Sequence, residues 1–167
     1  MLRVRNSYKG AKPVLVVTRT FDKYRAIGDP ISQAKIYEAQ LVDELFLVDI
    51  ERTEESWQIL LETLKTMSET LATPLAVGGG INSLRQVQTL LDRGADKVVL
   101  NTGALKDPSL INEVAGNYGS QCVVLSIDTR TNKNKEWEVF SSSGKHNEKR
   151  LIVEWGREAV ERGAGEI

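Results

Sequence analysis

The sequence predicts an α/β fold of about five βα units around a parallel sheet. Apolar runs of strand length alternate with longer segments of helical period, which is typical of βαβ units. The runs are nearly continuous in apolar character, as strands covered on both faces should be. We expect strands at residues 45–49, 75–77, 98–100 and 123–127.

The segments between these strands carry helix start and stop signals. Asp29 precedes Pro30, which fits an N-cap followed by proline at the first helical position, and Asp107 precedes Pro108 in the same way. Ser83 has capping-box spacing with the glutamine three residues later. Glycines follow several of these segments and favour a left-handed helix end. Helices are therefore expected from these starts, and also within residues 53–71, 110–118 and 151–162.

A similar junction joins helix to strand at residues 41–45, 94–98 and 163–167. Reuse of one junction indicates a fold assembled from similar units. The last copy should open a sixth strand. We therefore expect a single domain over residues 1–167, comprising strands one to five and the start of the sixth.

The composition excludes several kinds of partner. The net charge of −1 comes from 22 basic and 23 acidic residues spread along the chain, which argues against nucleic acid and acidic membranes. Cys122 is the only cysteine and His146 the only histidine, so a disulfide framework and most metal sites are excluded. No apolar run suits a leader or a membrane span. A cytoplasmic protein without metal or cofactor is expected.

Glycine and polar residues follow the predicted strands, at the ends where parallel barrels carry their functional groups. The run that includes Gly79 and Gly80 would let the backbone approach a ligand, and the next helix N-terminus suits a phosphate. Asn101 and Thr102 add an amide and a hydroxyl after the neighbouring strand. These four residues are candidates for phosphate binding, and the alternative is a purely structural turn.

Two aspartates also end predicted strands. Asp128 follows an apolar strand and precedes a predicted hairpin at residues 131–143, which favours general acid or base catalysis over helix capping. Asp49 has two alternatives of equal standing, because its carboxylate could orient a substrate or tie down the loops around it.

With these positions assembled, the chain resembles the cyclase subunit of imidazole glycerol phosphate synthase along almost its whole length. The resemblance implies a (β/α)8 TIM barrel, here incomplete, and a lyase of histidine biosynthesis. It rests on ordered matches at residues 1–5, 28–31, 42–45, 49–50, 77–81, 94–102, 117–121, 126–128, 143–145 and 162–167.

The resemblance also implies a reaction and a partner. Ammonia released from glutamine by a glutaminase subunit would attack a phosphorylated ribulosyl aminoimidazole carboxamide nucleotide. Asp128 matches the second of two catalytic aspartates, whereas Gly80, Asn101 and Thr102 match one of two phosphate sites. A ring of charges that gates ammonia entry is matched by Arg5, Glu44, Lys97 and Glu166. Without the resemblance, these charges would be ordinary solvated strand ends.

Two departures keep alternatives open. The stretch between Arg5 and Val14 has no acidic residue where the family has its first catalytic aspartate, and the second phosphate site would lie beyond Ile167. The chain could thus be an active cyclase or an inactive fragment. Residues 21–31 also resemble paralogues thought to supply ammonia for acetamidino sugar synthesis in surface polysaccharide. A third alternative is a non-catalytic phosphate-binding or assembly fragment, which self-associates through open sheet edges.

Overall fold

The computed structural model describes residues 2–6, 12–19 and 23–167, with only the backbone described for residues 2–6. The chain divides into two compact units. The first consists of Met1–Gly80 and Gln88–Val98, and the second of Ile81–Val87 and Val99–Ile167. Helix α3 (Leu84–Asp92) and strand β6 (Lys97–Leu100) each have residues in both units.

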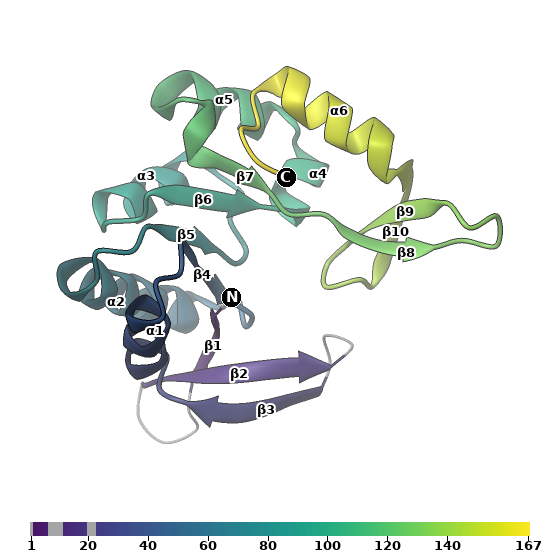
Figure 1. Cartoon of the computed structure of the whole chain (residues 1–167). Helices are drawn as coiled ribbons and strands as arrows, with labels where there is room; N and C mark the ends of the chain where they lie inside the picture. The colour runs from purple at the N-terminus through teal and green to yellow at the C-terminus, as the bar shows by residue number, and fades with distance from the viewer. Residues whose placement is uncertain (1, 7–11, 20–22) are drawn as a thin grey trace. The chain divides into compact units, whose positions relative to one another are not determined.

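The first unit contains the strands and helices drawn from purple to teal in Figure 1. Its elements are β1 (Leu2–Asn6), β2 (Pro13–Arg19), β3 (Lys23–Gly28), α1 (Pro30–Ala39), β4 (Leu45–Asp49), α2 (Glu54–Thr70) and β5 (Leu75–Gly78). The strands lie in the order β3-β2-β1-β4-β5. β4 runs parallel to both β1 and β5, so the predicted parallel βα arrangement is confirmed.

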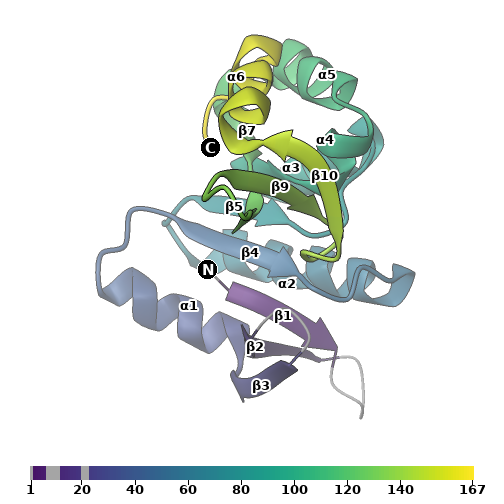
Figure 2. The same cartoon turned by 90° about the vertical axis from the view of Figure 1, so that its right-hand side faces the viewer.

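The helices of the first unit begin where the sequence predicts them to. Asp29 accepts the backbone N–H of Ser32 at 2.7 Å, and Pro30 is the first helical residue of α1. Thr53 caps α2 by accepting the N–H of Ser56 at 3.1 Å. Figure 2 shows these two helices beside β1 and β4, where α2 packs on both strands. The inner face of α2 is apolar and buried, with Leu60, Leu64 and Met67 fully covered.

The antiparallel pair β2 and β3 is an element that the sequence did not predict. β2 pairs with β1 on one side and with β3 on the other, both antiparallel. Every residue of β3 is exposed, so this strand lacks the apolar run or the alternation by which strands are recognised. Its conformation comes from hydrogen bonding to β2 rather than from burial.

The second unit carries a small antiparallel sheet of its own. Its elements are α4 (Thr102–Lys106), α5 (Ser109–Tyr118), a 3-10 turn (Ser120–Cys122), β7 (Val123–Leu125), β8 (Asp128–Thr131), β9 (Trp137–Ser141), β10 (His146–Leu151) and α6 (Ile152–Arg162). The sheet order is β10-β9-β8, so the predicted hairpin is a three-stranded sheet. α6 packs against β9 and β10, as Figure 1 shows in yellow and green.

Two sequence boundaries in this unit are corrected by the structure. The run at residues 123–127 ends as a strand at Leu125, and Asp128 opens the next strand instead of a loop. The helix expected to start at Pro108 begins at Ser109, whose N–H is accepted by Asp107 at 3.1 Å. Near the end of the chain, Glu166 forms a parallel bridge with Val124, at the place where a sixth strand is expected.

Helix α6 is fastened to the second unit by a buried tryptophan and by ion pairs. Trp155 is completely buried, and the Arg150 guanidinium lies 4.6 Å from the centre of its ring. Glu158 pairs with Arg150 and, at 2.8 Å, with Arg162. Within the residues that the structure describes, each helix is too short or too polar to cross a lipid bilayer.

Candidate functional site

The glycine run of the first unit forms a tight turn after β5. Gly79 has φ +119° and Gly80 has φ +74°, a region that side-chain-bearing residues rarely adopt. A Cβ on Gly79 would stand 2.3 Å from the backbone oxygen of Asp49, a severe overlap. The end of β5 and the end of β4 therefore approach each other so closely that only glycine fits at this position.

Asp49 lies at the centre of a hydrogen-bond network at the end of β4. Its side chain is 3% exposed. Oδ1 accepts the N–H of Glu51 at 2.9 Å, while Oδ2 accepts the N–H of Arg52 at 3.0 Å and the hydroxyl of Ser56 at 2.6 Å. Both oxygens are therefore engaged within the chain. Through these contacts Asp49 holds the loop after β4 in place. Tying down this loop is one of the two roles predicted for Asp49.

In the second unit the structure brings Asn101 and Asp128 together. The Asn101 amide nitrogen donates to Oδ2 of Asp128 at 3.1 Å, although the two residues are 27 positions apart. The Asn101 amide oxygen is buried and, among the described residues, has no hydrogen-bond partner. Asp128 is half-buried at the first position of β8, opposite Phe140. An oriented, partly exposed carboxylate of this kind can serve as a general acid or base.

Thr102 is held by the turn between β9 and β10. Its hydroxyl oxygen accepts the backbone N–H of Ser142 at 3.0 Å. Ser142 and Ser143 have φ values of +53° and +60°, and Gly144 follows with +71°. The sequence analysis did not include this turn in the predicted site, because no sequence pattern predicts a left-handed backbone conformation at two serines.

Two of the charges predicted to form a gate lie at strand entries, since Glu44 directly precedes β4 and Lys97 is the first residue of β6. Glu44 and Lys97 form an ion pair of 2.9 Å in the first unit, with side chains 19% and 24% exposed. Glu166, in the second unit, accepts the N–H of Leu125 at 2.8 Å through its backbone oxygen. Arg5 lies in β1, whose side chains are outside the described residues.

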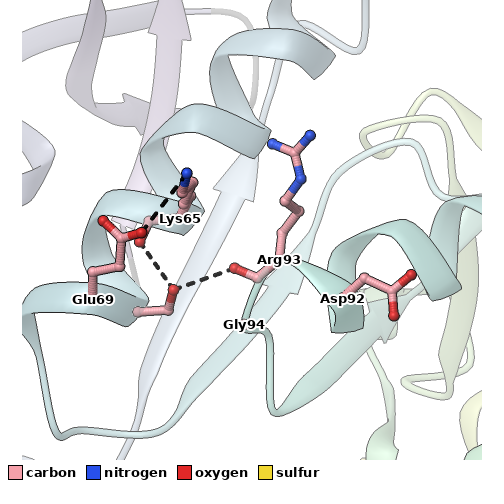
Figure 3. A pocket seen from close by; sticks show the side chains of 6 residues that line it. Lys65, Glu69, Asp92, Arg93 and Gly94 are labelled. Atoms are coloured by element: carbon pink, nitrogen blue, oxygen red, sulfur yellow. Dashed lines mark hydrogen bonds and ion pairs between the residues drawn. The ribbon is translucent and has the colours of Figure 1, made fainter.

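A hollow at the surface of the first unit lies where α2 and α3 end (Figure 3). The Ser68 hydroxyl lies within hydrogen-bond distance of the backbone oxygens of Lys65 and Arg93, at 2.9 and 3.3 Å. Opposite charges share this surface, and no predicted site residue lines it. Its mixed lining suits neither an anion nor a cation. The lining residues are Lys65, Ser68, Glu69, Asp92, Arg93 and Gly94.

Metal ligands do not gather in the part of the chain that the structure describes. No group of three or more histidine, cysteine, aspartate or glutamate side chains there could hold a metal ion. The polar groups that follow the strands are instead Asp49 and the glycine turn in the first unit, and Asn101, Thr102 and Asp128 in the second.

Comparison with known proteins shows which family the sequence matches. The family model described as "Histidine biosynthesis protein" matches residues 6–167. The chain is 60% identical over 164 residues to the "Putative imidazole glycerol phosphate synthase subunit hisF2" of Prochlorococcus marinus (strain MIT 9313). It is 43% identical over 145 residues to the "Imidazole glycerol phosphate synthase subunit HisF" of Prochlorococcus marinus (strain NATL2A). A HisF subunit of Gluconacetobacter diazotrophicus is 40% identical over 147 residues.

These alignments cover most of the chain but only part of each relative. The first covers 98% of this chain and 63% of the relative. The other two cover 86% and 88% of this chain and 57% of each relative. The chain thus spans about three fifths of the length of the curated relatives that it matches.

Proposed function

From the premise that the chain belongs to the histidine biosynthesis protein family, we propose that it acts as the cyclase subunit of imidazole glycerol phosphate synthase. Family membership also identifies its βα units as part of a (β/α)8 TIM barrel, as the resemblance implies. The proposed enzyme is a cytoplasmic lyase that uses ammonia and needs no cofactor.

The proposed reaction joins ammonia to a phosphorylated ribulosyl aminoimidazole carboxamide nucleotide. Imidazole glycerol phosphate, an aminoimidazole carboxamide ribotide and one water molecule are the products. The observation that carries this proposal is the hydrogen bond from the Asn101 amide to Asp128. An amide N–H can only donate, and an ionised carboxylate can only accept. The hydrogen bond therefore orients the Asp128 carboxylate, which is the group proposed to move the proton.

Phosphate binding is proposed for two sets of residues, one in each unit. Gly79 and Gly80 form the turn after β5 in backbone conformations that glycine favours, and their N–H groups are the proposed donors to a phosphate oxygen. Asn101 and Thr102 offer an amide and a hydroxyl, and the Thr102 hydroxyl is steadied by the Ser142 N–H. Each set supplies neutral donors that fit a phosphate ester.

A glutaminase subunit is the proposed partner and source of ammonia. Arg5, Glu44, Lys97 and Glu166 are proposed to form the gate through which ammonia enters. The 2.9 Å pair between Glu44 and Lys97 supports this role, because an ion pair that is about one fifth exposed can open and close with modest energy.

The cyclase assignment is tested by turnover with ammonium salt and the ribulosyl nucleotide. We expect release of imidazole glycerol phosphate, and we expect Asp128→Asn to lower it by a factor of at least about 100, as loss of a general acid or base does. Asp107→Asn is the matched control, since this carboxylate only accepts from Ser109 at a helix start. Absence of product from the unaltered chain would exclude cyclase activity in this chain.

The partner assignment is tested by comparing two ammonia sources. With a glutaminase subunit and glutamine, Lys97→Met should lower turnover, whereas turnover with free ammonium should stay unchanged because ammonia then enters from solution. Lys65→Met is the control, an exposed lysine that pairs only with Glu69 on its own helix. Equal loss with both ammonia sources would refute a gating role.

A second candidate is the paralogue that serves acetamidino sugar synthesis. Two observations favour it: the sequence has no acidic residue before Asp22, and the relative that shares 60% identity is named hisF2. Ammonia-dependent conversion of a sugar nucleotide, without conversion of the ribulosyl nucleotide, would select this candidate. Light scattering tests the third alternative, assembly through sheet edges, which a monomeric chain would refute.

A further inference from the structure

Arg52 occupies an unusual backbone position three residues after the buried Asp49. Its φ is +59°, in the left-handed region that residues other than glycine rarely adopt. The N–H of Arg52 donates to Oδ2 of Asp49 at 3.0 Å, and Ser56 donates to the same oxygen at 2.6 Å. The strained residue is thus held in place by a buried carboxylate.

The side chain of Arg52 lies along the glycine turn. A Cβ built on Gly80 would stand 3.0 Å from Cγ, 3.1 Å from Cβ and 3.4 Å from Cδ of Arg52. The apolar stem therefore lies against Gly80, so closely that a side chain there would require Arg52 to shift. Both residues are exposed.

We propose that Arg52 is an anion-binding residue of this turn, and that its guanidinium pairs with a phosphate group of the substrate. The inference rests on the proposed function, because it adds a residue to the phosphate site assigned to Gly79 and Gly80. Those glycines offer only neutral backbone donors, whereas a phosphate ester carries up to two negative charges. A guanidinium supplies the missing positive charge and a planar fork that matches two phosphate oxygens.

The Asp49 network gives this role a physical basis. A flexible arginine loses side-chain entropy when it binds, which weakens an exposed ion pair. Here the backbone is pinned by Asp49 and the stem is packed on Gly80, so less of that entropy remains to be lost. Asp49 is accordingly a positioning residue, which acts on the phosphate through Arg52.

The test is titration of the chain with inorganic phosphate, followed through the backbone amide signals of Gly79 and Gly80 by NMR. Arg52→Met keeps an apolar stem over Gly80 and removes only the charge. We expect its phosphate affinity to fall about tenfold, the loss that one charge-assisted hydrogen bond represents. The phosphate affinity of Arg52→Lys should lie between those of the unaltered chain and Arg52→Met, because lysine keeps the positive charge but lacks the planar guanidinium. Arg93→Met is the control, because it removes another exposed arginine of the first unit, which lines the hollow at the end of α3.

Three outcomes would overturn the inference. Unchanged affinity in Arg52→Met would refute it while leaving the glycine phosphate site intact. An equal loss in Arg93→Met would show a general effect of net charge. No phosphate binding by the unaltered chain would refute both the glycine site and this inference. If Arg52→Met fails to fold, Arg52→Asn is measured by the same criteria, because asparagine tolerates a left-handed backbone.

Discussion

Substitution of Gly79 by alanine should destabilise the first unit more than the same substitution at Gly28. Two effects combine at this position. Alanine at φ +119° costs about 1 to 2 kcal/mol in backbone strain. Its Cβ would also stand 2.3 Å from the backbone oxygen and 2.8 Å from the backbone nitrogen of Asp49. Because these atoms belong to a paired strand, β4 and β5 must separate, at a cost of about 1 to 3 kcal/mol.

The total expected loss is about 2 to 5 kcal/mol in the free energy of unfolding, a large part of the stability of an ordinary domain. Urea denaturation followed by circular dichroism measures it. Gly28→Ala is the matched control, because Gly28 has φ +141° and no atom within 4 Å of the added Cβ. It should show the backbone strain alone.

A second control measures the effect of an added methyl group without backbone strain and without overlap with other atoms. Gly116 lies inside α5 with no atom within 4 Å of an added Cβ, so Gly116→Ala should stabilise the chain by up to about 1 kcal/mol. The reasoning is refuted if Gly79→Ala and Gly28→Ala lower the free energy of unfolding equally. In that case the close approach to Asp49 would contribute nothing.

Three further predictions follow from the hydrogen bonds and ion pairs. Asp49→Ala should lower the free energy of unfolding by about 3 kcal/mol, because it strands three donors at the end of β4, and urea denaturation checks this. The hydrogen bonds from Arg150 and then Arg162 lower the pKa of Glu158 below its ordinary 4.5. Its stabilisation is therefore fully present above about pH 4.5 and disappears as pH falls through the lower folded-state value, so the stability difference between the unaltered chain and Glu158→Gln should vanish in acid. A double-mutant cycle of Glu44→Gln and Lys97→Met should give a coupling of about 0.5 to 1 kcal/mol at low salt that shrinks at high salt, and a salt-independent value would contradict it.

Several parts of this fold were predictable because their signals are local. The Asp29 cap followed by Pro30 predicts the start of α1, since the cap side chain and the N–H it accepts are three residues apart. The apolar run at residues 45–49 predicts β4, and Gly163 predicts the end of α6, because each signal lies within a few neighbouring residues. The order of glycine, amide and carboxylate residues after successive strands indicated where a site should be sought.

Other parts depend on partners that no local pattern specifies. β3 is exposed throughout and exists because β2 pairs with it. β10 completes a sheet where the sequence predicts only a hairpin at residues 131–143. The three donors that Asp49 meets, from Glu51, Arg52 and Ser56, could likewise not be predicted from the sequence. Arg52 was missed because its left-handed backbone and its packing on Gly80 follow from that carboxylate.

The sequence by itself determined the α/β class, the alternation of strands and helices, the glycine turn and the place of Asp49 at the end of a strand. Each of these follows from periodicity or capping within a few residues. Only the tertiary structure decided that Asn101 donates to Asp128, that Ser142 steadies Thr102, and that the Arg52 stem covers Gly80. These contacts join residues 27, 40 and 28 positions apart, and such pairings depend on strand register and backbone conformation rather than on any local pattern.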